Sequence, residues 1–317
     1  MQDSTVEIGS FTTREGAVIP SVQQRVTIYG DPASRVVLVP HALTGSSRVH
    51  EWWGALVGEN RTFDPREFCI VGINALGGCY GSTGPAGKPE FPYVSVADIV
   101  QAQARALHEL GIERIWLAIG ASLGGMQALQ WALDFPQRID RAVMVGSHDH
   151  QSAMGIALNA IQRDVIAVDP RAGVRIARKI AMLSYKSDDL LRERHDRRPD
   201  RKAVHRYDVE GYLEHQADLF EARMDPYSYV ALTHAMDSFD VRDRTVNNPA
   251  QRLLFVGISG DWLFRPQDVR AAAERFGANG AACDYAEIVS THGHDAFLAE
   301  PEKLSTILRR WMPGAPA

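Results

Sequence analysis

The residues from Ile115 to Leu129 contain the serine whose surroundings best suit chemistry. A short apolar run leads into Gly-Ala-Ser-Leu-Gly at residues 120–124, and a helical pattern begins directly after it. A strand, a G-x-S-x-G motif and a helix in this order are typical of a nucleophile elbow, in which a sharp turn exposes a serine hydroxyl at the edge of a parallel sheet. Ser122 is therefore the candidate nucleophile. A glycine-rich turn with an unreactive serine is the alternative.

Two backbone N–H groups are predicted to stabilise an oxyanion beside this serine. The first belongs to Leu123, because the first N–H groups of a helix have no partner within the helix and carry partial positive charge. The second belongs to Leu43, in the loop Pro40–Ser46 that follows the apolar run Arg35–Val39. An earlier strand-to-helix loop supplies the second donor in hydrolases with this motif. A plain connection is the alternative for this loop.

An acid and a histidine follow the serine in the chain, each just beyond a predicted strand. Asp261 follows the run Arg252–Ile258, and His294 follows the run Cys283–Val289. The order Ser, Asp, His is that of the α/β-hydrolase fold. In this interpretation Ser122 attacks an acyl carbonyl, His294 takes up and returns the proton, and Asp261 orients the imidazole and stabilises its charged form.

Other residues compete for these roles. Asp268 and Asp284 are the alternative acids, but the first is expected inside a helix and the second inside a strand. His292 is the alternative base. The pairs His292-x-His294 and His148-x-His150 are spaced like zinc ligands but lack a third ligand at a recognisable spacing, so no metal site is predicted.

Composition excludes several classes of function. The 317 residues carry a net charge of −5, which makes nucleic acid and anionic membranes unsuitable partners. Three cysteines without C-x-x-C spacing predict neither a disulfide framework nor a zinc-thiolate site, as is usual in a reducing cytoplasm. The segment Met1–Thr13 does not resemble a signal peptide, and no apolar run is long enough to span a membrane. A cytoplasmic location is expected.

The order of apolar runs predicts an α/β fold with a mostly parallel sheet. An edge hairpin is expected within Val6–Tyr29, followed by buried strands alternating with helices. The alternation stops between residues 147 and 240, where helical patterns recur in Ala172–Leu183 and Tyr207–Arg223. Residues 1–146 and 241–317 are therefore predicted to form the core, and residues 147–240 a helical cap inserted above the site.

Several longer motifs resemble the homoserine O-acetyltransferase family of α/β-hydrolase-fold acyltransferases. The most specific is N-A-L-G-G-C-Y-G-S-T-G-P at residues 74–85. The others are P-H-A-L-T-G at 40–45, the elbow with G-M-Q-A-L-Q-W at 125–131, G-D-W-L-F at 260–264, and G-H-D-A-F-L at 293–298. The resemblance implies acetyl transfer from acetyl-CoA to the hydroxyl of L-homoserine, a step of methionine biosynthesis, through an acyl-serine in a ping-pong mechanism.

The resemblance also implies the residues that bind the acceptor. The segment R-K-I-A-M-L-S-Y at 178–185 is similar to the family segment whose arginine and tyrosine bind the amino acid. Arg178 and Tyr185 are therefore expected to face the carboxylate of homoserine, and Asp295 its ammonium group. An arginine fork matches a carboxylate, and an acid beside the catalytic histidine can select an amine. Acetyl-CoA is expected as a co-substrate, with no resident cofactor.

The chain departs from the family pattern at three places. Leu123 stands where the family usually has methionine, the stretch after Pro85 is short, and the cap lacks a glycine- and aromatic-rich segment between Pro170 and Arg178. A smaller cap leaves a carboxylesterase or thioesterase with the same triad as an alternative, together with succinyl as the acyl group or serine as the acceptor. A catalytically silent binding protein is a further alternative. The oligomeric state stays open, and a homodimer through cap helices is one of the options.

Overall fold

The computed structural model describes residues 1–312 of the chain. Its centre is one eight-stranded sheet with the strand order β1-β2-β4-β3-β5-β6-β7-β8. The strands are β1 (Gln2–Thr12), β2 (Val18–Tyr29), β3 (Arg35–Pro40), β4 (Phe68–Ile73), β5 (Leu117–Ala121), β6 (Arg141–Val145), β7 (Arg252–Ile258) and β8 (Ala282–Ile288). β1 and β2 form the predicted antiparallel hairpin, and β2 also pairs antiparallel with β4. All other pairings are parallel, as the continuous apolar runs predicted.

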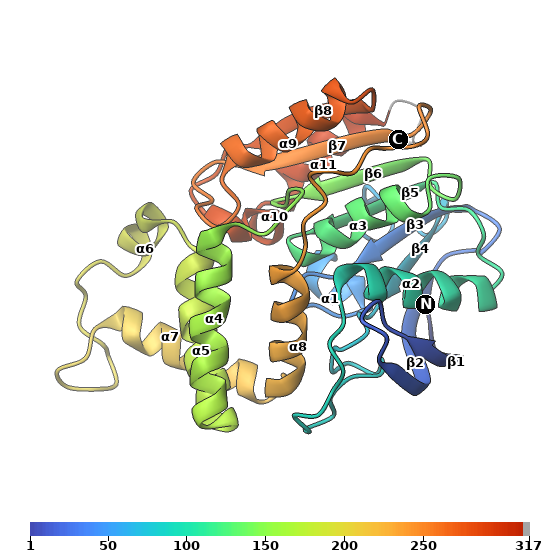
Figure 1. The fold of residues 1–317 in the computed structure, drawn as a ribbon. Helices are drawn as coiled ribbons and strands as arrows, with labels where there is room; N and C mark the ends of the chain where they lie inside the picture. Colours follow the sequence, from blue (N-terminus) through green and yellow to red (C-terminus); the bar gives the residue numbers. More distant parts are fainter. Residues whose placement is uncertain (313–317) are drawn as a thin grey trace.

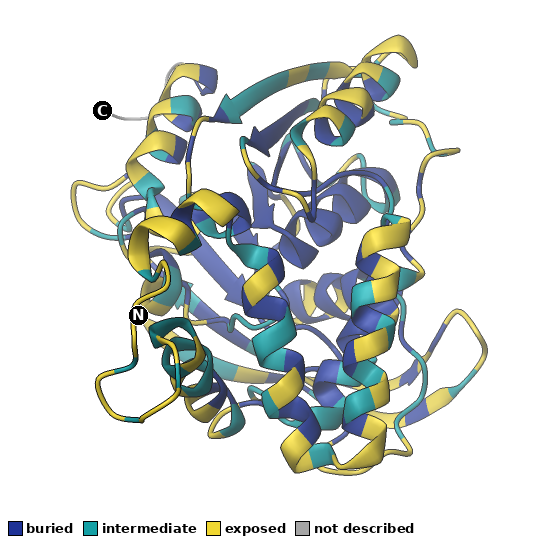
Figure 2. Cartoon of the chain, turned by 90° about the vertical axis from the view of Figure 1, so that its left-hand side faces the viewer, coloured by how far each residue is buried: buried dark blue, intermediate teal, exposed yellow. Residues whose placement is uncertain are grey.

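Helices cover both faces of this sheet, which is why the central strands are apolar on both sides. One face packs against α2 (Val96–Glu109), α3 (Leu123–Asp134) and α9 (Pro266–Ala278), the other against α1 (Val49–Trp53) and α11 (Pro301–Trp311). Figure 1 shows this arrangement. Figure 2 shows that the strands are buried and that the helices around them have exposed outer faces. The predicted capping box starts α2, with the Asp98 N–H donating to Ser95 Oγ and the Ser95 N–H donating to the Asp98 carboxylate.

Five consecutive helices lie between β6 and β7 in the chain. They are α4 (Ala153–Val168), α5 (Pro170–Tyr185), α6 (Asp188–Arg194), α7 (Asp208–Glu221) and α8 (Pro226–Asp237), and they stand together beside the sheet in Figure 1. Asp169 separates α4 from α5, and its carboxylate accepts the backbone N–H groups of Arg171 and Ala172 while Pro170 occupies the first turn. This is a typical helix start. We call these five helices the cap.

Two short helices complete the fold near the last strand. The 3₁₀ helix η1 (Gly293–Asp295) and α10 (Ala296–Ala299) follow β8 and lead into α11. Within the described residues, none of the helices combines the length and apolar character needed to span a bilayer.

Candidate active site

Ser122 occupies the turn between β5 and α3. Its φ angle is 55°, in the left-handed region that non-glycine residues rarely adopt, and its N–H donates to the Val145 carbonyl at 2.9 Å. A Cβ atom on Gly120 would collide with the carbonyl oxygen of Gly124, and one on Gly124 with that of Pro40. Glycine is therefore required on both sides of the serine. These contacts hold Ser122 at the carboxyl edge of the sheet in a strained turn.

His294 and Asp261 form a buried pair. His294 lies in η1, and its Nδ1–H donates to Asp261 Oδ2 at 2.7 Å. The other carboxylate oxygen, Oδ1, accepts the backbone N–H groups of Leu263 and Phe264, each at 2.9 Å, so the acid is held by its own loop. Burial alone would lower the pKa of His294, but the charge and hydrogen bond of Asp261 outweigh it and raise that pKa.

The end of β6 brings the histidine and the serine to the same place. A Cβ atom on Gly146 would lie 3.3 Å from the His294 ring, and the residue before it, Val145, accepts the Ser122 N–H. The ring of Tyr185 lies 5.6 Å from that of His294, and Tyr185 also lines the pocket at Ser122. Among residues 1–312 no hydrogen bond joins Ser122 Oγ to His294. In free enzymes this contact is often long and tightens when substrate binds.

The competing acids have other partners. Asp268 lies in the first turn of α9 and pairs with Arg265 at 2.8 Å. Asp284 lies in β8, where it accepts a hydrogen bond from Trp311 Nε1 at 2.7 Å and pairs with Arg252. Both therefore lack the position that Asp261 has beside His294.

Both predicted oxyanion donors border the serine. Leu123 is the first residue of α3, and Leu43 lines the pocket together with Ser122. Neither N–H donates to an acceptor within the described residues 1–312, so both are available to a negatively charged oxygen. Leu43 and Leu123 therefore remain the candidate oxyanion donors.

His41 holds the loop that carries Leu43. Its Nε2 accepts the Ala75 N–H at 3.0 Å, which places the ring proton on Nδ1, and this group donates to the Ala42 carbonyl at 2.7 Å. Because the ring is fully buried, the pKa of His41 is lowered to about 4, and the imidazole is neutral at pH 7. His41 therefore links the loop at residues 40–46 to the glycine-rich loop at residues 74–85.

The pocket beside Ser122 is small and closed. Its free volume is about 10 Å³, roughly the space of one water molecule. Its walls are mostly residues of the cap, and three amide side chains contribute polar groups: Gln151, Asn159 and Gln162. These amides were not among the residues predicted from the sequence, where their only signal was the spacing of Asn159 and Gln162 on one face of a helix. Substrate entry requires the lining residues to move.

Comparison with known proteins decides the family. Residues 35–301 match the family model described as the alpha/beta hydrolase fold. A homoserine O-succinyltransferase of Nitrosospira multiformis is 34% identical over 98% of this chain and 98% of its own, and a homoserine O-acetyltransferase of Acidiphilium cryptum is 35% identical over 89% and 86%. The solved homoserine O-acetyltransferase from Staphylococcus aureus matches with a TM-score of 0.87 at 28% identity, over 98% of this chain and 95% of that one.

The chain belongs to the homoserine O-acyltransferase family. The predicted α/β-hydrolase fold is confirmed, and so are the resemblance to this family and the assignment to the acyltransferase class of enzymes. The relatives carry both acetyl and succinyl names, so family membership leaves the acyl group open.

In this member of the homoserine O-acyltransferase family, Arg178 is a cation without an anion. Its guanidinium carbon lies 4.9 Å from the Phe220 ring centre and 6.0 Å from that of Tyr185. The side chain is half-buried, its Nε has no hydrogen-bond partner, and no carboxylate within residues 1–312 pairs with it. A buried polar group without a partner is costly, so a ligand carboxylate is a suitable occupant.

Asp295 has a partner that the sequence analysis did not anticipate. Lys186 Nζ lies 2.7 Å from its Oδ2, and both side chains are largely buried. The lysine directly follows Tyr185 in the chain, so the predicted ammonium site already contains a cation. A homoserine ammonium group at Asp295 would have to share or displace this lysine.

The pair His148-x-His150 does have a third potential metal ligand, the intervening Asp149. Ligand atoms of His148, Asp149 and His150 lie within 4.8 Å of one another. However, Asp149 Oδ2 pairs with Arg275, and Oδ1 accepts from His150 Nδ1 at 2.9 Å. Both carboxylate oxygens are thus already engaged, which does not suit a cation. His292, which was paired with His294 in the sequence, is not one of the residues in this group.

Proposed function

We propose that this protein transfers an acetyl group from acetyl-CoA to the side-chain hydroxyl of L-homoserine through an acyl-Ser122 intermediate. The observation that carries the proposal is the position of Arg178. This half-buried arginine has no carboxylate partner in the described residues and lies against Tyr185, whose ring packs beside that of His294. A carboxylate bound at Arg178 would hold a small amino acid with its other end near the catalytic base.

In the first half-reaction the serine becomes acylated. His294 Nε2 accepts the proton of Ser122 Oγ while this oxygen attacks the thioester carbonyl. The backbone N–H groups of Leu43 and Leu123 stabilise the negative oxygen that forms. When the carbon–sulfur bond breaks, His294 returns the proton to the departing thiolate and CoA leaves as its thiol.

In the second half-reaction the homoserine hydroxyl replaces CoA. His294 takes the proton of this hydroxyl, the oxygen attacks the acyl-serine carbonyl, and the proton then returns to Ser122 Oγ as the ester leaves. Arg178 and Tyr185 are proposed to bind the amino-acid carboxylate. A carboxylate held at these two residues would place the homoserine hydroxyl at the acyl-serine and so favour it over water.

Acetyl is the proposed acyl group, and succinyl is the alternative that the names of the relatives keep open. The walls of the Ser122 pocket support acetyl. The side chains described as lining it are apolar, hydroxyl or amide groups without a cation. A succinyl carboxylate would therefore be buried there without a charge partner, which is unfavourable.

A donor-by-acceptor panel with the purified protein tests this function. Acetyl-CoA and succinyl-CoA are each supplied with L-homoserine, L-serine or no acceptor, and CoA release is followed with a thiol reagent. We expect rapid release only with acetyl-CoA and homoserine together. CoA release that homoserine does not accelerate would instead identify a thioesterase. A preference for succinyl-CoA would change the proposed acyl group but not the proposed acceptor.

A further inference from the structure

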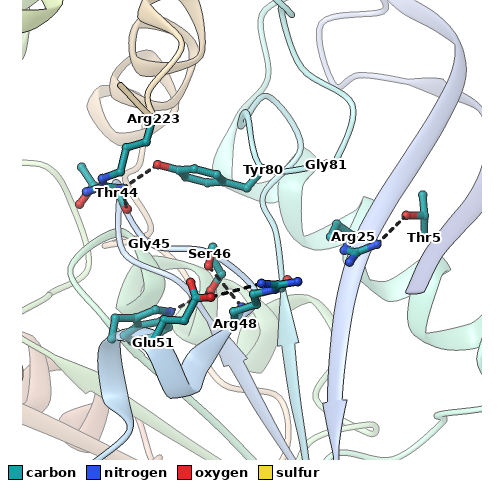
Figure 3. A pocket seen from close by; sticks show the side chains of 12 residues that line it. Thr5, Arg25, Thr44, Gly45, Ser46, Arg48, Glu51, Tyr80, Gly81 and Arg223 are labelled. Carbon is teal, nitrogen blue, oxygen red and sulfur yellow. Dashed lines mark hydrogen bonds and ion pairs between the residues drawn. The ribbon is translucent and has the colours of Figure 1, made fainter. Parts of the chain in front are cut away.

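A second and larger cavity lies beside the catalytic pocket. It has a volume of about 650 Å³, and its walls come from β1, β2, the loop at residues 44–47, α1, the glycine-rich loop and the turn between α7 and α8. Figure 3 shows the side chains around it. Thr44, on its wall, directly follows Leu43, which lines the pocket at Ser122. The same loop therefore contributes to the walls of both cavities.

Three arginines face this cavity in a chain whose net charge is −5: Arg25, Arg48 and Arg223. Arg25 and Arg48 share one carboxylate, Asp3, at 2.9 and 2.7 Å, and Glu51 lies 3.4 Å from Arg48. A guanidinium group has five N–H donors, so sharing a carboxylate leaves donors of both arginines unused. The cluster carries more positive than negative charge.

Arg223 differs from the other two because it binds only neutral oxygens. Its Nη1 donates to the Thr44 carbonyl at 2.8 Å and to the Tyr80 hydroxyl at 2.6 Å, as Figure 3 shows. No carboxylate within residues 1–312 pairs with it. Its charge is therefore available to an anion in the cavity, and the residue connects the cap to the loop that carries Leu43.

An aromatic surface completes the cavity. The Trp52 indole is half-buried, and its Nε1–H donates to the Ser46 carbonyl at 2.9 Å, which holds the ring in place on the loop. A fixed indole offers a stacking surface to a planar base, and arginines are suited to phosphate groups. The cavity thus combines the two chemistries that recognise a phosphorylated nucleoside.

We propose that this cavity binds the phosphorylated adenosine end of the acyl-CoA donor, with Arg25, Arg48 and Arg223 at the phosphates and Trp52 at the adenine. This inference rests on the proposed acyl-CoA-dependent function. The acyl arm then passes over the loop at residues 43–45 toward Ser122. Binding energy from the nucleotide end holds the thioester at the serine without taking part in the chemistry.

The test compares two acetyl donors that share the thioester but differ in the nucleotide. One is acetyl-CoA, and the other is the acetyl thioester of N-acetylcysteamine. We expect Arg25→Ala and Arg48→Ala each to raise KM for acetyl-CoA about tenfold, with kcat and the kinetics of the short thioester unchanged. The matched control is Arg309→Ala, which replaces an exposed arginine of α11 and should change the kinetics with neither donor.

A direct binding measurement separates this inference from the proposed function. Adenosine 3′,5′-bisphosphate is titrated into the wild-type protein and the same variants by calorimetry. We expect binding that weakens about tenfold in Arg25→Ala and Arg48→Ala but not in Arg309→Ala. Absence of binding to the wild type, or equal KM changes for both donors, would overturn the inference even if acyl transfer to homoserine is observed. Equal competition by inorganic phosphate would show a phosphate site without nucleotide recognition and would also overturn it.

Discussion

The Nδ1 atom of His294 lies 2.7 Å from Oδ2 of Asp261, a residue 33 positions earlier in the chain. This contact commits the ring proton to Nδ1 and leaves Nε2 free to accept a proton. Because Asp261 is itself held by two backbone N–H groups, the acid fixes both the orientation and the tautomer of the histidine.

Replacing Asp261 by asparagine should reduce kcat by about 10⁴-fold. The amide oxygen can still accept the two backbone N–H groups, but the side chain loses the charge that stabilises protonated His294. Steady-state kinetics and a thermal unfolding curve measure the two effects separately. A variant that keeps more than a tenth of the wild-type kcat would show that another acid serves His294.

The pH dependence of kcat/KM should show a rising limb with a midpoint above 6.5, the ordinary pKa of histidine. Asp261 raises the pKa of His294, and the base works only when neutral, so activity is lost as the pH falls through this raised value. The profile is measured for the free enzyme at low substrate concentration. A midpoint below 6.5 would contradict the dominance of Asp261 over burial.

Arg178→Gln should raise KM for homoserine about 10- to 100-fold, because a charged hydrogen bond to the carboxylate is worth about 1.5–3 kcal/mol. Hydrolysis of the acyl-enzyme in the absence of acceptor should stay within a factor of about two. Lys179→Gln is the matched control, since this neighbouring residue on α5 pairs with Glu214. Equal effects of both substitutions on KM would indicate a general charge effect of the helix.

His41 should make the fold sensitive to acid. Its pKa is lowered to about 4 in the folded protein and returns to about 6.5 on unfolding, so its contribution to stability is lost as the pH falls from 6.5 toward 4. Between pH 7 and pH 5 this contribution amounts to about 2 kcal/mol. The free energy of unfolding of His41→Gln, measured with urea, should therefore decrease between pH 7 and pH 5 by about 2 kcal/mol less than that of the wild type. An unchanged pH dependence would contradict the buried neutral state.

Gly120→Ala should destabilise the protein by more than about 3 kcal/mol or prevent folding, because its Cβ would collide with the Gly124 backbone inside the elbow. Gly277→Ala is the control. That glycine lies in α9, and a Cβ there would meet only Cys283 at 4.0 Å, so alanine should be neutral or stabilising by up to about 1 kcal/mol. Chemical unfolding of both variants measures the contrast. Similar stabilities would show that the elbow tolerates a side chain.

Local patterns in the sequence were sufficient for most of the fold. Continuous apolar runs predicted strands such as β3 and β7, and the Ser95 and Asp98 pair predicted the start of α2. These features depend on residues near one another in the chain, where backbone geometry and hydrogen bonding follow directly from residue type. The order of Ser122, Asp261 and His294 also indicated a site, because parallel strands place their carboxyl ends at one edge.

Contacts between side chains far apart in the chain could be seen only in the folded protein. Lys186 and Asp295, Asp149 and Arg275, and Arg223 and Thr44 are each more than a hundred residues apart, and no sequence spacing predicts that they touch. Residue types and their order were enough to predict the elbow, the sheet and the candidate triad. Which charges remain without a partner, at Arg178 and around the larger cavity, depends on packing between the cap and the core, since a charge is free or paired only once distant segments of the chain are brought together.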